Sequence, residues 1–143
     1  MSDTDAEAQA LRNTPFFSGL TDEDISHIVG VGEQVRFEAG ASIFEQGAVG
    51  DAMFVLLEGQ AEVDVGGRFH KLKPGTFFGE MALFSAGTRL ATVKTTEPVR
   101  ALRIPADGFQ AVLLAHPRVA LSMLKAMSER LREVEQRVDA WMG

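Results

Sequence analysis

The chain has 143 residues, 45% hydrophobic and 24% charged, which fits one globular domain with its own core. It has no cysteine, which excludes disulfide bonds and zinc sites built from thiolates. A formal net charge of −6 argues against non-specific binding to nucleic acid or an anionic membrane. The segment MSDTDAEAQA does not resemble a signal peptide, and no apolar run can span a bilayer. A soluble, cytoplasmic domain is expected.

Residues 1–33 are predicted to be helical. Thr21 precedes Asp24 by the spacing of a capping box, which marks the start of a helix. That helix carries Ile25, Ile28 and Val29 as its apolar residues. The preceding segment PFFSGL is also apolar and is expected to pack against the rest of the domain.

Residues 34–104 change character, because short β-rich runs alternate there with glycine-containing turns. The predicted strands are QVRF, SIFEQ, MFVLL, AEVDV, RFHKL, LATVKT and VRALRI. Many short strands at this spacing predict a sandwich or barrel. The fold class is therefore α+β and mainly β.

The segment from AEVDV to RFHKL is predicted to be a β-hairpin. Gly66-Gly67 separates the two runs, and two glycines suit a two-residue hairpin turn. The alternation within AEVDV places Ala61, Val63 and Val65 on one face of the strand. This face is expected to point into the barrel.

Residues 105–143 are predicted to be helical again. A short helix runs from Asp107 to Ala115, and His116-Pro117 breaks it. Proline is favoured in the first turn of a helix, so a second helix can begin at Pro117 and run to about Trp141. The whole chain, 1–143, is expected to be one domain with no effector domain after the last helix.

The last helix carries an apolar seam with alternating steps of three and four, as in a coiled coil. Its members are Leu124, Met127, Leu131, Val134, Val138 and Trp141. Arg130 and Glu135 flank the seam with opposite charges, which suits a parallel homodimer. Alternatively, Leu121, Leu124 and Met127 pack this helix back onto the barrel. The sequence leaves both readings open.

The candidate site is the stretch FFGEMALFSAGTRLATV at residues 77–93. If GEMAL opens a short helical turn, its free N–H groups attract an anion, and Arg89 donates a planar, charged fork to it. Glu80 would repel a highly charged phosphate but accept a hydrogen bond from a sugar hydroxyl. The pair therefore suits a singly charged phosphodiester attached to a sugar. A structural ion pair between Glu80 and Arg89 is the alternative.

This stretch resembles the phosphate-binding cassette of cyclic nucleotide-binding domains, in which FGEMAL is followed after five residues by RLATV. The family includes the regulatory domains of catabolite activator protein, cAMP-dependent kinase regulatory subunits and cyclic-nucleotide-gated channels. The glycine framework before the cassette is also similar: FEAG (37–40), IFEQG (43–47), GD (50–51), MFV (53–55), LEG (57–59) and PG (74–75). The resemblance implies an antiparallel β-roll or jelly-roll barrel with N-terminal helices and two C-terminal helices.

The resemblance also implies ligand contacts. Arg89 would bind the exocyclic phosphate oxygens, and Glu80 would accept from the ribose 2′-hydroxyl. The remaining contacts are expected from the N–H groups of Gly79, Met81 and Ala82, from Leu90 and Ala91, from the apolar side chains of Val63, Val65 and Met81, and from Arg130, Leu131, Val134 and Glu135 of the last helix. In this set the Glu135 carboxylate would accept from the adenine 6-amino group.

Two residues depart from the family pattern. Thr88 stands where the family usually has proline, which predicts a less rigid loop. Leu90 stands where the family often has Ala, Ser or Thr, and it offers no hydroxyl to phosphate or to the guanine 2-amino group. cAMP is therefore expected to bind better than cGMP.

The function expected from the resemblance is that of a cAMP sensor without enzymatic activity, signalling through its last helix to an unknown effector protein. No cofactor or metal is expected, because His27, His70 and His116 lack the spacing of a metal site. No nucleic-acid or membrane partner is expected either. The start at Met1 suggests a stand-alone module, although a piece of a longer protein fits as well. The alternative is a degenerate fold that serves protein interaction or dimerisation without nucleotide.

Overall fold

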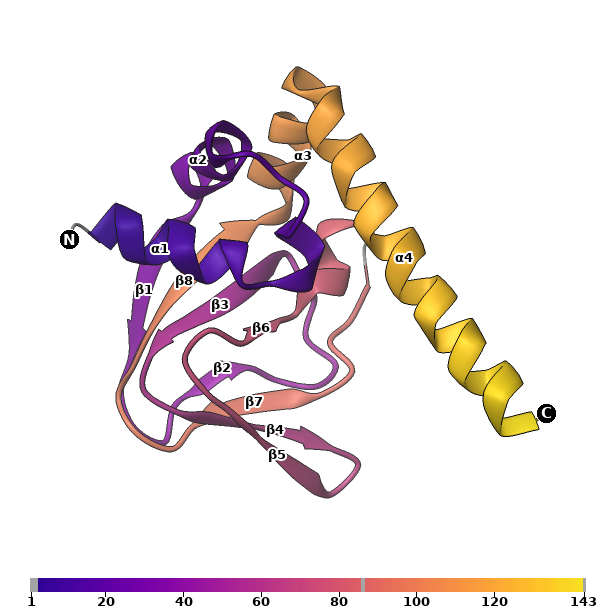
Figure 1. The fold of residues 1–143 in the computed structure, drawn as a ribbon. Helices are drawn as coiled ribbons and strands as arrows, with labels where there is room; N and C mark the ends of the chain where they lie inside the picture. The colour runs from indigo at the N-terminus through magenta and orange to yellow at the C-terminus, as the bar shows by residue number, and fades with distance from the viewer. Residues whose placement is uncertain (1–2, 86, 143) are drawn as a thin grey trace.

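The structure is a computed structural model that describes residues 3–85 and 87–142. Its strands form two antiparallel four-stranded sheets, ordered β1-β8-β3-β6 and β2-β7-β4-β5 (Figure 1). The first sheet consists of β1 (Glu33–Phe37), β8 (Val99–Pro105), β3 (Ala52–Glu58) and β6 (Phe77–Phe78). The second consists of β2 (Ser42–Phe44), β7 (Thr92–Thr95), β4 (Ala61–Val65) and β5 (Arg68–Leu72). The predicted mainly antiparallel β fold is confirmed, with two paired sheets in place of a closed barrel.

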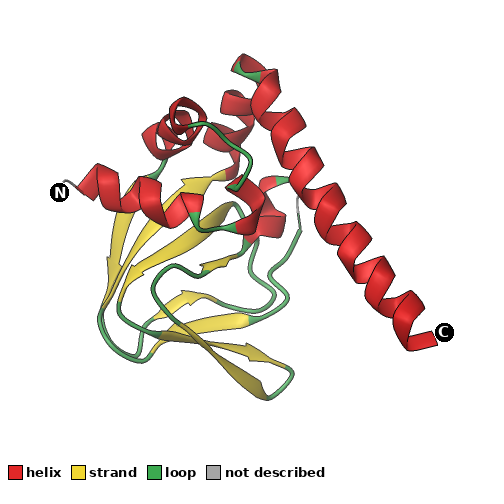
Figure 2. Cartoon of the chain, in the orientation of Figure 1, coloured by secondary structure: helices red, strands yellow, loops and turns green. Residues whose placement is uncertain are grey.

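The helices gather on one side of the strands (Figure 2). They are α1 (Asp3–Arg12), α2 (Asp22–Val31), α3 (Ala106–Ala115) and α4 (Pro117–Met142), with the 3₁₀ turns η1 (Pro15–Phe17) and η2 (Glu80–Leu83). The predicted capping box is present at α2: the Thr21 hydroxyl accepts from the Asp24 N–H at 3.2 Å, and the Asp24 carboxylate accepts from the Thr21 N–H at 3.3 Å.

Strand β3 lies between two apolar clusters, which explains its continuous apolar sequence. Met53 and Val55 point into the cluster formed with the helices. Ala52, Phe54 and Leu56 point into the cluster between the two sheets. Both sets are buried because side chains alternate between the faces of a strand.

The β4–β5 hairpin has the predicted turn, in which Gly66 and Gly67 have φ of +61° and +86°. These positive φ values are the conformations that a two-residue hairpin turn requires and that glycine adopts without strain. The inward face of β4 is shorter than predicted. Ala61 is buried, but Val65 is 50% exposed because it lies at the end of β4 beside the turn.

Helix α4 begins at Pro117 as predicted, but it does not pack through the expected residues. Val119 and Met123 are the buried apolar side chains of its first turns. Leu121, Leu124 and Met127, offered as an alternative packing face, are 53%, 59% and 36% exposed. That alternative is wrong for Leu121 and Leu124, because the face that carries Val119 and Met123 points to the body. Beyond its first turns the helix runs away from the sheets (Figure 1).

Candidate functional site

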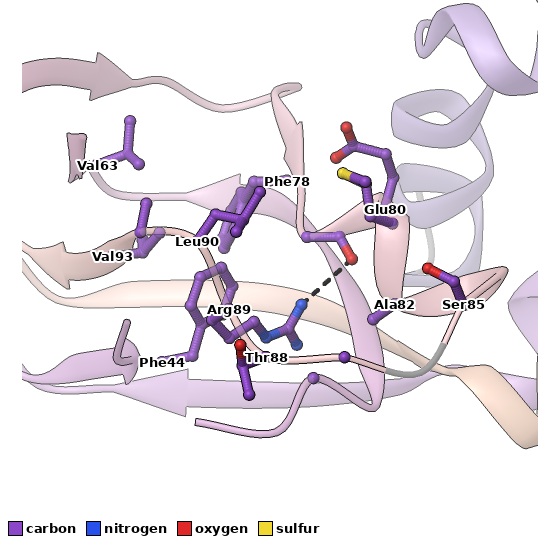
Figure 3. A pocket seen from close by; sticks show the side chains of 15 residues that line it. Phe44, Val63, Phe78, Glu80, Ala82, Ser85, Thr88, Arg89, Leu90 and Val93 are labelled. Carbon is purple, nitrogen blue, oxygen red and sulfur yellow. Dashed lines mark hydrogen bonds between the residues drawn. The ribbon is translucent and has the colours of Figure 1, made fainter. Parts of the chain in front are cut away.

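A cavity of about 350 Å³ lies beside the cassette. Its walls come from η2, from the loop that leads to Arg89, and from strands of both sheets (Figure 3). The lining is mostly apolar, with Arg89 and Glu80 as its charged residues. A small-molecule site of this size, apolar with a few placed polar groups, is the usual form of a ligand pocket.

Arg89 is the only buried arginine among the residues whose burial the structure describes, with 8% exposure. Its Nη2 donates to the Ala52 carbonyl at 2.7 Å, and its Nη1 donates to the Gly79 carbonyl at 3.3 Å. Its Nε is buried and has no hydrogen-bond partner. The guanidinium is therefore held in place by two neutral acceptors, and its Nε–H remains without an acceptor.

The charges around Arg89 do not neutralise it directly. Burial lowers the pKa of Arg89, the charge of Asp51 raises it, Arg103 lowers it and Glu80 raises it again. Between 3 and 85 and between 87 and 142, no ion pair joins Arg89 to either carboxylate. A guanidinium stays protonated in proteins, so a buried positive charge forms part of the cavity lining.

Two glycines make room for this guanidinium. A Cβ on Gly79 would lie 2.8 Å from Arg89 Nη1, and a Cβ on Gly50 would lie 3.0 Å from Arg89 Nε. Gly79 also has φ of +77°, a conformation that other residues rarely adopt. The glycine before Glu80 is thus required both by the backbone and by the position of Arg89.

An aromatic ring also contacts the guanidinium. The Cζ of Arg89 lies 4.1 Å from the centroid of the Phe44 ring, in the range of a cation–π contact. Phe54 and Phe78 stack at 5.6 Å, and both contact Phe44 at about 6 Å between centroids. The side chain of Arg89 is therefore fixed by packing as well as by hydrogen bonds.

The loop containing Thr88 is held by a short ladder to residues 46–50. The Arg89 N–H donates to Ala48 O at 2.7 Å, and the Gly50 N–H donates to Gly87 O at 3.0 Å. Val49 and Thr88 form an antiparallel bridge between these bonds. These contacts supply constraint where the family usually has proline, so Thr88 does not leave the loop unsupported.

Glu80, Met81 and Ala82 all line the cavity from η2. Glu80 is partly buried, and no ion pair joins it to Arg89 in the described part of the chain. The alternative of a structural ion pair is therefore wrong for this structure. The Ala82 N–H, expected to hold the ligand, donates instead to Gly79 O at 3.2 Å because that bond closes the 3₁₀ turn.

The rim of the cavity is apolar. Val63, Leu90 and Ala91 line it, with Leu90 74% exposed and Met81 63% exposed. Figure 3 shows Val63 and Val93 on one side of Leu90 and Glu80 on the other. Val65, predicted to contact the ligand, is not among the lining residues, because the strand end that carries it lies beside the turn.

The geometry agrees with the comparison of this chain with known proteins. The family model described as "Cyclic nucleotide-binding domain" matches residues 34–116. The chain belongs to the cyclic nucleotide-binding domain family. The match begins at the second residue of β1 and ends at His116, so it contains the whole cassette but not α4.

Relatives in this family combine the domain with other parts. A cAMP-dependent protein kinase regulatory subunit of Aspergillus fumigatus is 35% identical over 72% of this chain, which spans 26% of that protein. A cyclic AMP receptor protein of Thermus thermophilus is 27% identical over 90% of this chain, which spans 62% of that protein. The N-terminal domain of a transcriptional regulator from Streptomyces coelicolor superposes with a TM-score of 0.80 at 30% identity, covering 89% of this chain and 95% of that domain.

The cyclic nucleotide-binding domain described here does not bring α4 to the cavity. Leu131 and Val134 are 60% and 49% exposed, and neither they nor Glu135 line the cavity. The side chain of Arg130 lies outside the described residues, as do those of Val138 and Trp141. The expected contact of this helix with the base stays a prediction. In this structure the buried apolar side chains described on α4 are Val119 and Met123, in its first turns.

The site includes residues that the sequence did not single out. Phe44, Gly50, Phe78, Ser85 and Val93 line the cavity. Phe44 and Gly50 lie within the glycine framework, and Phe78, Ser85 and Val93 lie within the stretch 77–93, but none of the five was predicted to line the cavity. Among the described side chains no group of three or more His, Cys, Asp or Glu could hold a metal ion. No described helix is long and apolar enough to cross a membrane.

Proposed function

We propose that this cyclic nucleotide-binding domain binds cAMP, with Arg89 on the phosphate and Glu80 on the ribose. The observation that carries the proposal is the buried Arg89 guanidinium, which has an unpartnered Nε and no carboxylate within ion-pair distance among the described residues. A buried charge without a partner is costly. An anion in the adjacent cavity offsets that cost.

The ligand charge follows from the two charged residues. One guanidinium balances one negative charge, and Glu80 would repel a second. A cyclic phosphodiester carries one negative charge and presents a ribose 2′-hydroxyl that a carboxylate accepts from. The apolar rim of Val63, Met81 and Leu90 suits the faces of a purine.

The choice of cAMP over cGMP is supported by Leu90. Its side chain has no hydroxyl for the guanine 2-amino group, and it lies 74% exposed at the rim. The names of two relatives, a cAMP-dependent kinase regulatory subunit and a cyclic AMP receptor protein, point to the same nucleotide.

Calorimetry with the unmodified chain tests the proposal. Titration of cAMP is expected to show one site with a Kd of about 10 µM or tighter, and cGMP is expected to bind more weakly. Absence of heat from both nucleotides, together with absence of a shift in melting temperature, would contradict the proposal and support the degenerate module.

Replacing Leu90 by threonine should narrow the difference between the nucleotides. The new hydroxyl can accept from the guanine 2-amino group, and one such hydrogen bond is worth about 1 kcal/mol, or about fivefold in affinity. The ratio of the cGMP and cAMP dissociation constants is the quantity to measure. Leu90→Val is the control, because valine has nearly the shape of threonine but no hydroxyl. It should leave the ratio unchanged.

We further propose that α4 transmits the bound state to an effector protein and that the chain itself performs no reaction. A two-state change requires that the ligand bind one position of α4 better than the other. The described part of the α4 seam is exposed at Leu124, Leu131 and Val134, which lets the helix pack against alternative partners, among them a second copy of the chain.

Val134→Asp should disrupt a dimer formed through this seam. Val134 is 49% exposed in the single chain. A carboxylate buried in an apolar seam would be desolvated without a hydrogen-bond partner, which destabilises the dimer. Sizing by sedimentation velocity over a concentration series is the measurement. Gln136→Asp places the same charge on α4 off the seam and should leave the dimer intact. A wild-type chain that is monomeric at every concentration would contradict the seam assignment.

A further inference from the structure

Two histidines far apart in the sequence stack in the fold. The rings of His27, on α2, and His116, between α3 and α4, lie 4.0 Å apart between centroids with an interplanar angle of 17°. Histidine changes its charge between about pH 5 and pH 8. The interaction between two stacked histidine rings therefore depends on pH in that interval. Neutral rings stack favourably, and two imidazolium ions at this distance repel each other.

His116 occupies the hinge that sets the direction of α4. It is the single residue between α3 and α4, and its backbone is non-helical, with φ of −133° and ψ of 74°. Its N–H donates to Val112 O at 2.8 Å, and its carbonyl accepts from the Val119 N–H at 2.9 Å. Any force on the ring of His116 acts on the residue that joins the two helices.

The charged groups recorded near the stack are Glu23, Asp24 and Arg118. Glu23 Oε1 lies 3.8 Å from His27 Nε2 on the same face of α2. Arg118, in the first turn of α4, lies 3.7 Å from the Asp24 carboxylate of α2. Glu23 can balance a charge on His27, but Asp24 already faces Arg118, and no other carboxylate is recorded against the ring of His116 among the described residues.

We propose that the His27–His116 stack is a proton-sensitive latch that fixes the start of α4 to α2 and opens when both imidazoles are charged. At neutral pH the stacked rings and the Arg118–Asp24 pair hold the hinge to α2. At acidic pH the two charged rings repel, and the first turn of α4 is released. Because α4 is the proposed output of nucleotide binding, this latch makes the output depend on pH, and that consequence rests on the proposed function.

Amide hydrogen exchange tests the latch without any nucleotide, so its result is independent of whether cAMP binds. The reporters are the N–H groups of His116 and Val119, with a β3 amide as reference for global stability. After correction for the intrinsic rate, exchange at the two hinge amides is expected to rise about tenfold relative to the reference between about pH 7.5 and pH 5.5.

Variants that keep an aromatic ring but cannot bind a proton are the matched controls. His116→Phe and His27→Phe should each abolish the pH response of the hinge amides. His70→Phe, which changes an exposed histidine on β5, should leave the response as in the wild type. An unmodified chain whose hinge amides follow the reference at both pH values would overturn the proposal. So would a response that persists in both ring-keeping variants.

Discussion

Arg89→Lys is expected to abolish measurable cAMP binding by calorimetry while the chain remains folded. Lysine keeps the positive charge but lacks the planar guanidinium fork. Its single nitrogen cannot bind both the Ala52 and Gly79 carbonyls in that geometry and still donate to a phosphate. A hydrogen bond to a charged group is worth up to about 3 kcal/mol, so its loss weakens affinity by about a hundredfold.

The effect of Arg89→Lys on stability must be measured alongside, because the guanidinium also satisfies two carbonyl groups. Leaving a buried acceptor unsatisfied costs about 1–3 kcal/mol, so urea denaturation should show a loss of that order. Arg36→Lys on β1 is the matched control, since Arg36 is exposed and should change neither affinity nor stability. If Arg89→Lys binds cAMP as tightly as the unmodified chain, the phosphate is bound elsewhere and the assignment is wrong.

The strands were predictable from the sequence because their signals are local. Alternation and glycine turns located seven of the eight strands, and the hairpin at Gly66-Gly67 has the expected register. The missing strand, β6, has only Phe77 and Phe78, too few residues to show a period. The capping box at Thr21 was equally local and equally correct.

The site was predictable only in part, because motif residues and supporting residues carry different signals. Arg89, Glu80 and Gly79 stand in a recognisable cassette, and the structure brings them to one cavity. Phe44 supports Arg89 from a strand more than forty residues earlier, and that contact depends on how two sheets pack. Nothing local in the sequence specifies such a distance.

The position of α4 shows a second limit of sequence reasoning. The heptad spacing identified which residues form one stripe, but a stripe does not say what covers it. Here the described members of the stripe, from Leu124 to Val134, are 36–60% exposed, and Val119 and Met123 make the contact with the body. The stack of His27 on His116 could not be predicted for the same reason, since it joins α2 to the residue between α3 and α4, and no local pattern fixes how these segments pack.

Gly79→Ala is expected to weaken cAMP binding by about tenfold or more while the chain remains folded. A Cβ at this position would lie 2.8 Å from Arg89 Nη1, 3.3 Å from Ala52 O and 3.3 Å from the Phe44 ring. The guanidinium is the part that can move, so the methyl group displaces it from the Ala52 and Gly79 carbonyls. The displaced guanidinium then no longer holds its Nε–H in position to donate to a phosphate in the cavity.

Gly40→Ala separates this displacement from backbone strain. Gly40 has φ of +79°, close to the +77° of Gly79, but a Cβ there would meet no atom within 4 Å. Both variants should lose about 1–2 kcal/mol of unfolding free energy to the left-handed backbone, measured by urea denaturation. Gly79→Ala should lose about 1–3 kcal/mol more, because the displaced guanidinium leaves a buried carbonyl unsatisfied. Only Gly79→Ala should also lose affinity in calorimetry. Equal affinity losses in the two variants would mean that binding follows stability, and that Gly79 does not position Arg89.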